Sequence, residues 1–162
     1  MSMLSSFDPM KLLRLAPLIT STASLMYGHD QHLFFSAFLH DSYRPEANKF
    51  LPSWFKICLK RAILPILTLY PLSITLAATN IYLSDQGSSD ARLWYWSGLA
   101  FTMGHFLFGK KAARLLVAIE NDQSGGNSTK DMREWLDMNF VRTLTVDLLS
   151  WLSFLMAAMA SG

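Results

Sequence analysis

Four ionisable residues interrupt apolar segments of this chain, and their side chains are those of acid–base chemistry. His29 and His32 lie in MYGHDQHLFF, three residues apart and therefore on one face of a helix. His105 lies in LAFTMGHFLFGKK, and Asp147 lies in FVRTLTVDLLSW. An imidazole can accept a proton near neutral pH, and a carboxylate can hold that imidazole in one tautomer. The four residues are therefore candidate catalytic groups, with His105 or His32 as the base and Asp147 as its partner.

Histidine is also the commonest transition-metal ligand, so a redox centre is an alternative. His29 or His32 facing His105 could hold a haem or a metal ion between helices. The chain contains neither an HExxH motif nor paired ExxH motifs. We therefore expect no cofactor, and we keep a haem- or metal-binding membrane redox protein as an alternative.

The composition indicates a membrane protein. Hydrophobic residues make up 51% of the 162 residues and charged residues 16%, which is low for a soluble domain. The mean hydropathy is +0.23. A net charge of +2, with the basic residues in connectors rather than on one stripe, argues against nucleic-acid binding. Cys58 is the single cysteine, which excludes an internal disulfide.

The hydropathy pattern predicts one all-α domain over residues 1–162, an integral membrane four-helix bundle. A spanning helix needs about 20 apolar residues. The segments that meet or approach this length are 12–39, 63–83, 93–109 and 140–160. The connectors DSYRPEANKFLPS, SDQGSSDA and NDQSGGNSTKD are expected to be loops. Pro65 and Pro71 predict a bend in the second helix, and strands are disfavoured because lone strands find no backbone partners in lipid.

The positive-inside rule orients the four predicted spans. Most Lys and Arg residues outside the spans lie in the first and third connectors: Arg44, Lys49, Lys56, Lys60, Arg61, Lys110, Lys111, Arg114, Lys130 and Arg133. We therefore expect an endoplasmic reticulum protein whose termini are lumenal and whose first and third connectors are cytosolic. The acceptor pattern at Asn127 argues the other way, and the sequence does not decide whether Asn127 is glycosylated.

In this topology, three of the ionisable groups fall at one depth. At about 1.5 Å per residue, His32 and Asp147 lie roughly 10 Å from the cytosolic ends of their spans, and His105 roughly 6 Å. Ionisable groups inside a membrane usually face the interior of the bundle. The sequence therefore predicts a water-poor pocket where these side chains meet. Trp151 shares a face with Asp147 and is a candidate for substrate binding.

The C-terminal half resembles a family of small four-helix membrane proteins that includes the fungal anthrone oxygenases. The resemblance is carried by GKKAARLL after the third span, by Trp135, and by the element Asn139-Phe140-Val141-Arg142 that opens the last span. It implies a tailoring step in secondary metabolism on a lipophilic polyketide-like or terpenoid-like intermediate. Asn139 and Arg142 carry over as family positions and are candidates for substrate binding, whereas the histidines and Asp147 rest on the depth argument alone.

The resulting hypothesis is an enzyme that deprotonates a lipophilic substrate, with Arg142 binding an anionic or phenolate group. The carbanion can then react with oxygen without an evident cofactor, as the resemblance implies. An isomerase or cyclase would use the same acid–base pocket and remains open. A non-catalytic membrane scaffold, with the polar residues as helix-packing contacts, remains open as well. The expected partners are the bilayer, the substrate and, in a thin bundle, a second copy of the chain.

Overall fold

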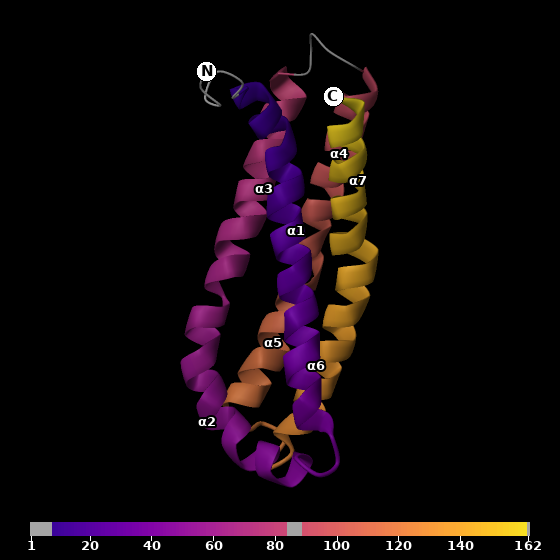
Figure 1. The fold of residues 1–162 in the computed structure, drawn as a ribbon. Helices are drawn as coiled ribbons and strands as arrows, with labels where there is room; N and C mark the ends of the chain where they lie inside the picture. Colours follow the sequence, from indigo (N-terminus) through magenta and orange to yellow (C-terminus); the bar gives the residue numbers. More distant parts are fainter. Residues whose placement is uncertain (1–7, 84–88, 162) are drawn as a thin grey trace, which may run out of the picture.

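The computed structural model describes residues 8–83 and 89–161, and the elements formed by these residues are helices without strands. They make four long rods (Figure 1). The rods comprise, in chain order, α1 (Pro9–Ser36) with η2 (Ala37–Leu39); α2 (Arg44–Ala62) with α3 (Leu64–Leu83); α4 (Ser89–Gly104), η4 (His105–Phe108) and α5 (Gly109–Glu120); and α6 (Ser128–Arg142), η5 (Thr143–Asp147) and α7 (Leu148–Ala160). The predicted all-α four-helix bundle is confirmed.

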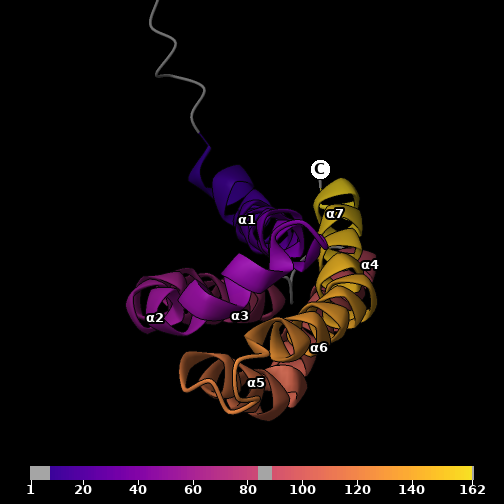
Figure 2. The ribbon, with the colours of Figure 1, turned by 90° about the horizontal axis from the view of Figure 1, so that it is seen from below.

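The four rods surround a common centre when viewed along their length (Figure 2). One half of the molecule contains most of α1 together with α3, α4 and α7, and the other half contains α2, α5 and α6 (Figure 1). Neighbouring rods pack as α4 with α7, α1 with α3, and α5 with α6. The predicted spans 63–83, 93–109 and 140–160 contribute mainly to the first half.

The second half corrects two expectations, because segments predicted to be loops are helical. DSYRPEANKFLPS is helical from Arg44 onward and belongs to α2, and α6 begins at Ser128 within NDQSGGNSTKD. The reason for α2 is a buried face, since Ala47, Leu51 and Phe55 recur every four residues and are at most 3% exposed. The charged residues between them lie on the solvated side and hide this amphipathic pattern from a search for uniformly apolar spans.

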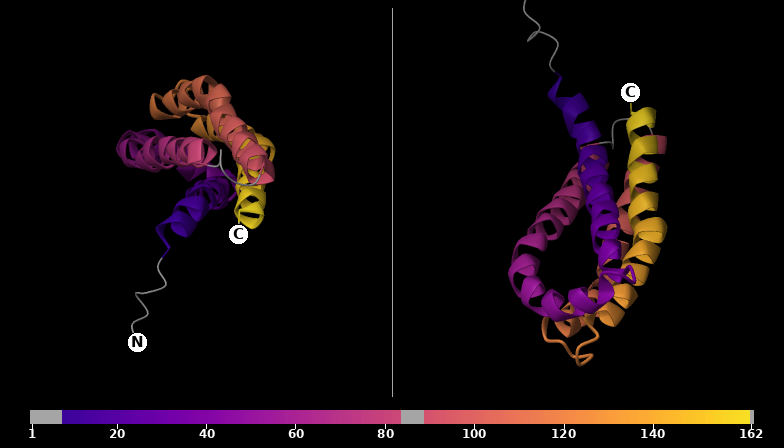
Figure 3. Two further views of the ribbon diagram at one scale, coloured as in Figure 1. Left: turned by 90° about the horizontal axis from the view of Figure 1, so that it is seen from above. Right: turned by 60° about the horizontal axis from the view of Figure 1, so that its bottom comes forward.

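The second rod is interrupted at Ile63, between α2 and α3. Pro65 lies two residues later, and its ring nitrogen cannot donate the hydrogen bond that an unbroken helix would make to the Arg61 carbonyl. The rod consequently bows away from α1 before returning at its ends (Figure 3). The bend predicted from the prolines therefore lies at the start of the predicted span, near Pro65.

Two apolar clusters hold the ends of the bundle. The cluster in the lower half of Figure 1 comprises Ala47, Leu51, Phe55, Leu115, Ile119, Met132, Trp135, Leu136 and Met138. The cluster in the upper half comprises Ala77, Ile81, Ala91, Tyr95, Phe154 and Ala157. Buried polar side chains occupy the layer between them, among them Ser24, Ser73, Thr102 and Ser150. The buried interior is therefore mainly apolar toward both ends and mainly polar at mid-height.

Two helical rods among the described residues are long and apolar enough to cross a membrane, Arg44–Leu83 and Ser128–Ala160. They contain the predicted spans 63–83 and 140–160. The rods that contain 12–39 and 93–109 do not meet the same standard. Of the four predicted spans, the structure therefore supports two, 63–83 and 140–160, by length and composition.

Gly98 allows α4 to pack tightly against Phe154 of α7. A Cβ at Gly98 would lie 2.4 Å from Cε1 of Phe154, whose side chain is fully buried. We predict that Gly98→Ala lowers the free energy of unfolding by about 1–3 kcal/mol, because the ring must move out of a packed site. Thermal unfolding in detergent, followed by circular dichroism, measures the loss.

Gly109→Ala is the matched control, because nothing lies within 4 Å of a Cβ at this helical glycine. It should leave stability unchanged or raise it by up to about 1 kcal/mol, the ordinary helix preference of alanine over glycine. Equal effects of the two substitutions would contradict the close α4–α7 contact.

Candidate active site

A π-helical turn places the carboxylate of the site. Residues Thr143–Asp147 form η5, a wider turn inserted between α6 and α7. In a regular α-helix, residues five apart point about 140° away from each other, whereas a π turn brings them to one side. Arg142 and Asp147 therefore face the same way, and Arg142 Nε donates a hydrogen bond to Asp147 Oδ2 over 3.2 Å.

Asp147 is the centre of a buried polar cluster built from three of the four rods. Its Oδ1 accepts a hydrogen bond from Tyr70 Oη of α3 at 3.0 Å, and it lies 3.2 Å from Nδ1 of His105 in η4. Asp147, His105, Arg142 and Tyr70 are each at most 6% exposed. The positive guanidinium of Arg142 balances the carboxylate, as a buried charge requires.

The rings of Tyr70 and His105 also contact each other directly. Their centroids are 3.6 Å apart and their planes are tilted by 37°. Because Nδ1 of His105 faces Asp147, Nε2 is the ring nitrogen that remains for a substrate, and it makes no hydrogen bond to the described residues. The tyrosine ring and the carboxylate together fix the plane of the imidazole.

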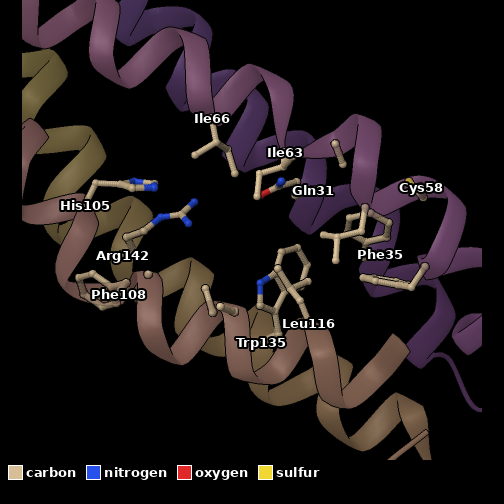
Figure 4. Close-up of a pocket in the computed structure, with 16 residues that line it drawn as sticks. Gln31, Phe35, Cys58, Ile63, Ile66, His105, Phe108, Leu116, Trp135 and Arg142 are labelled. Carbon is tan, nitrogen blue, oxygen red and sulfur yellow. The ribbon is translucent and has the colours of Figure 1, made fainter. Parts of the chain in front are cut away.

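An apolar cavity of about 160 Å³ lies beside this cluster. Its walls come from α1, α2, α3, η4, α5 and α6, and include Phe35, Phe55, Cys58, Leu59, Ile66, Phe108, Ala112, Leu116 and Trp135. His105, Arg142 and Gln31 supply polar groups, and Figure 4 shows the His105 ring and the Arg142 guanidinium pointing into it. Ile63, which is 40% exposed, also lines the cavity, so it reaches the protein surface.

The structure brings His105 and Asp147 together and places the other two candidate catalytic residues elsewhere. His29 is exposed on α1. The ring of His32 packs against Phe140, with centroids 5.5 Å apart, and lines a separate surface hollow. His32 and Asp147 were matched in depth along the helices, but the rotation of α1 turns His32 away from the cluster.

The three histidines offered as metal or haem ligands do not converge. His105 faces Asp147, His32 packs against Phe140, and His29 is exposed. Nowhere in residues 8–83 and 89–161 do three or more His, Cys, Asp or Glu side chains gather as a metal site would require. The predicted ligand set therefore does not fit a haem or metal ion held between helices.

Two candidate substrate-binding residues lie outside the cavity wall, while Arg142 belongs to it. Asn139 is fully buried, and its Nδ2 donates to Oε1 of Gln31 over 3.4 Å. Asn139 thus reaches the cavity only through Gln31. Trp151 points toward α1, where its Nε1 donates to Thr22 Oγ1 over 2.8 Å.

Sequence reasoning missed Tyr70 and Gln31. Tyr70 lies seven residues into the second predicted span, which is roughly 10 Å at the usual helical rise, so the depth argument applied to that span would have found it. Gln31 lies in the GHDQH stretch, where His29 and His32 were the predicted catalytic groups. The apolar walls from α2 and α5 lie outside the predicted spans 63–83 and 93–109, so the pattern of spans did not indicate them.

Three curated fungal proteins are similar to this chain over nearly its whole length. A protein named "probable epoxidase scpX" from Mollisia scopiformis is 38% identical, covering 92% of this chain and 95% of its own length. The "epoxidase gkaX" from Penicillium citrinum is 37% identical, covering 94% and 96%. The "epoxidase pydX" from Acremonium sp. is 35% identical, covering 93% and 94%. No protein-family model and no solved structure matches the chain.

The π turn predicts an unusual tolerance to deletion. Removing the exposed Thr145 should convert η5 to an α turn and leave Arg142 and Asp147 four residues apart on one face. We expect this variant to fold. Its free energy of unfolding should fall by no more than about 3 kcal/mol, the upper end of the usual range for a single mutation. Unfolding in detergent measures the loss.

Deleting Leu149, one turn later in α7, is the control. It rotates the rest of α7 by about 100° and takes Phe154 out of its place against Gly98. This variant should lose cooperative unfolding. Similar behaviour of the two deletions would argue that η5 is not the element that keeps the two faces aligned.

Proposed function

Because the chain belongs to the fungal family that contains these epoxidases, we propose that it is a membrane-embedded tailoring enzyme of secondary metabolism that oxygenates a lipophilic intermediate. The family assignment confirms the resemblance found in the C-terminal half. The geometry that best supports an enzyme is the His105–Asp147–Arg142 cluster at the polar end of an apolar cavity. A purely structural cluster would not need an adjoining cavity.

Membrane embedding is supported by how little of the apolar surface is covered. Only 17% of the most apolar window of Arg44–Leu83 and 28% of that of Ser128–Ala160 are buried within the chain. The central helix of a soluble protein would be mostly covered. Large apolar side chains such as Leu67, Leu72 and Leu107 are exposed instead, as contact with lipid would require.

The cavity fits part of a lipophilic molecule. A volume of about 160 Å³ resembles that of an engineered cavity that binds benzene, so it accepts about one ring or an equivalent chain segment. The rest of the substrate would extend out of the cavity at the protein surface near Ile63. Its reacting end would lie at His105 and Arg142, the polar end of the cavity shown in Figure 4.

Each polar residue has a distinct part in the proposed reaction. His105 Nε2 removes a proton from an activated C–H or O–H group of the substrate. Asp147 and Tyr70 hold the imidazole in position, and Asp147 keeps the proton-bearing nitrogen on its own side. The terminal nitrogens of Arg142 stabilise the enolate or phenolate oxygen that forms, because a guanidinium matches such an oxyanion well.

The proposed oxidant is dioxygen. The deprotonated substrate adds O₂ at carbon to give a peroxide. One oxygen atom stays on the substrate when the O–O bond breaks, and the other leaves as water. The substrate itself supplies the two electrons and two protons that reduce this second oxygen atom to water. The reaction therefore balances without a separate reductant or cofactor. The substrate must therefore be electron-rich and carry an acidic hydrogen, as phenols and enolisable ketones do.

We predict that His105→Gln and Asp147→Asn each reduce product formation by about 10²-fold or more, the usual contribution of general-base catalysis. The chain is expressed in a host that makes the pathway intermediate, and the extracts are compared by mass spectrometry at equal protein abundance. His40→Gln is the matched control, because His40 is exposed and bonds only Ser42 and backbone in its own turn.

Growth under ¹⁸O₂ separates oxygenation from rearrangement. One ¹⁸O atom in the product supports the oxygenase, whereas an unlabelled product whose formation still needs His105 indicates an isomerase or cyclase. Product levels that are insensitive to both His105→Gln and Asp147→Asn would contradict an enzyme and favour a scaffold.

A further inference from the structure

Three buried polar atoms in the described part of the chain lack a hydrogen-bond partner, and all three lie between α1 and the α6–η5 helix. They are Nδ1 of His32, Oδ1 of Asn139 and Oγ1 of Thr143. Leaving such an atom without a partner costs about 1–3 kcal/mol, so buried polar groups of this kind usually bind water. Their position along one helix contact indicates a shared cause.

The two helices run antiparallel and in step. Oε1 of Gln31 accepts from Asn139, and one turn further a Cβ at Gly28 would lie 3.1 Å from Thr143 Oγ1. The next turn brings α1 to the level of Asp147. Each turn rises about 5.4 Å, a distance that one bridging water spans with two hydrogen bonds. We call this contact, from His32 and Asn139 past Gly28 and Thr143 to Asp147, the seam.

The inner end of the seam is a small polar cavity of about 10 Å³, close to the space that one water occupies. It is lined by Ser21, Ser24, Tyr70, Ser73, Thr102, Asp147 and Ser150. None of these residues lines the larger apolar cavity. The Asp147 carboxylate therefore has a polar space of its own, separate from the space proposed for the substrate.

The outer end of the seam opens at His32. The His32 side chain lines a surface hollow together with Ser36, Arg133 and Asp137, while its Nδ1 is buried and unpartnered within the described chain. One side of the imidazole therefore faces the hollow and the other faces the seam. Gly28 marks the close approach of the two helices, because a Cβ there would lie 3.1 Å from Thr143 Oγ1 and 3.7 Å from Nη2 of Arg142.

We propose that buried water fills the seam and connects the Asp147 carboxylate to solvent at His32. The water site itself rests on the unpartnered atoms and the polar cavity, and its role rests on the proposed function. When His105 Nε2 takes a proton from the substrate, Nδ1 passes its proton to Asp147 and the carboxylate passes it to the seam water. The reverse transfer returns one proton when the second oxygen atom leaves as water, so the reaction has no net proton change.

Solvent exchange of the His105 ring N–H proton tests the proposal without a substrate. The protein is labelled with ¹⁵N at histidine, and the exchange rate is measured by NMR in detergent. Gly28→Ala puts a methyl group into the seam, and Thr143→Val removes the hydroxyl while keeping the shape. We expect each to slow the exchange by about tenfold, as when one hydrogen-bonding partner of the water is lost. Thr143→Val decides the question if Gly28→Ala does not fold.

Ala112→Leu is the control, because it fills the apolar cavity and leaves the seam open. It should leave the exchange rate unchanged. If Ala112→Leu slows the exchange and the seam variants do not, water reaches His105 through the substrate cavity and the proposal is wrong. Exchange that is already as slow in the unaltered chain as in the seam variants also overturns it. Failure of the proposed function shows separately, as product levels insensitive to His105→Gln.

Discussion

The buried carboxylate of Asp147 is the constraint on which the arrangement of the helices depends. A carboxylate at 4% exposure is stable only where hydrogen bonds and an opposite charge replace its water. Tyr70, His105 and Arg142 supply these contacts from α3, η4 and α6. Breaking a buried ion pair by removing one partner costs about 3–5 kcal/mol, so the helices are held to the one arrangement in which all three contacts form.

The charge balance at this point also determines what the cluster can do. Arg142 and Asp147 form a neutral pair, so a proton taken up at His105 adds a net positive charge to the cluster. Apolar clusters above and below the polar layer limit the access of water to it. In such surroundings an electrostatic interaction is stronger than in water, so Arg142 can act on a developing oxyanion more effectively than a surface arginine could.

Depth along a helix is one of two coordinates that place a side chain, and it is the one that the sequence provides. Depth identified His105 and Asp147, and it would have identified Tyr70. It failed for His32, because the second coordinate is the rotation of α1, which depends on packing against α6 at Gly28. The Arg142–Asp147 contact needs a π turn, and no residue pattern in TLTVD predicts one.

The helical segments beyond the predicted spans explain why the apolar walls of the cavity could not be anticipated. Phe55, Cys58 and Leu59 belong to α2, and Trp135 belongs to α6, in stretches whose mixed charge made them resemble connectors. These stretches fold because each has one apolar face, and they enclose the cavity only when they pack together.

The position of the cavity relative to the polar layer gives a bound molecule its direction. Phe35 and Trp135 line its apolar part, whereas His105 and Arg142 lie at its other end (Figure 4). Burying a lipophilic molecule with one polar group costs the least free energy when that group meets the guanidinium and the apolar body meets the aromatic walls. The orientation therefore follows from where the buried charges lie, and a cavity of the same shape without Arg142 would accept the molecule in either direction.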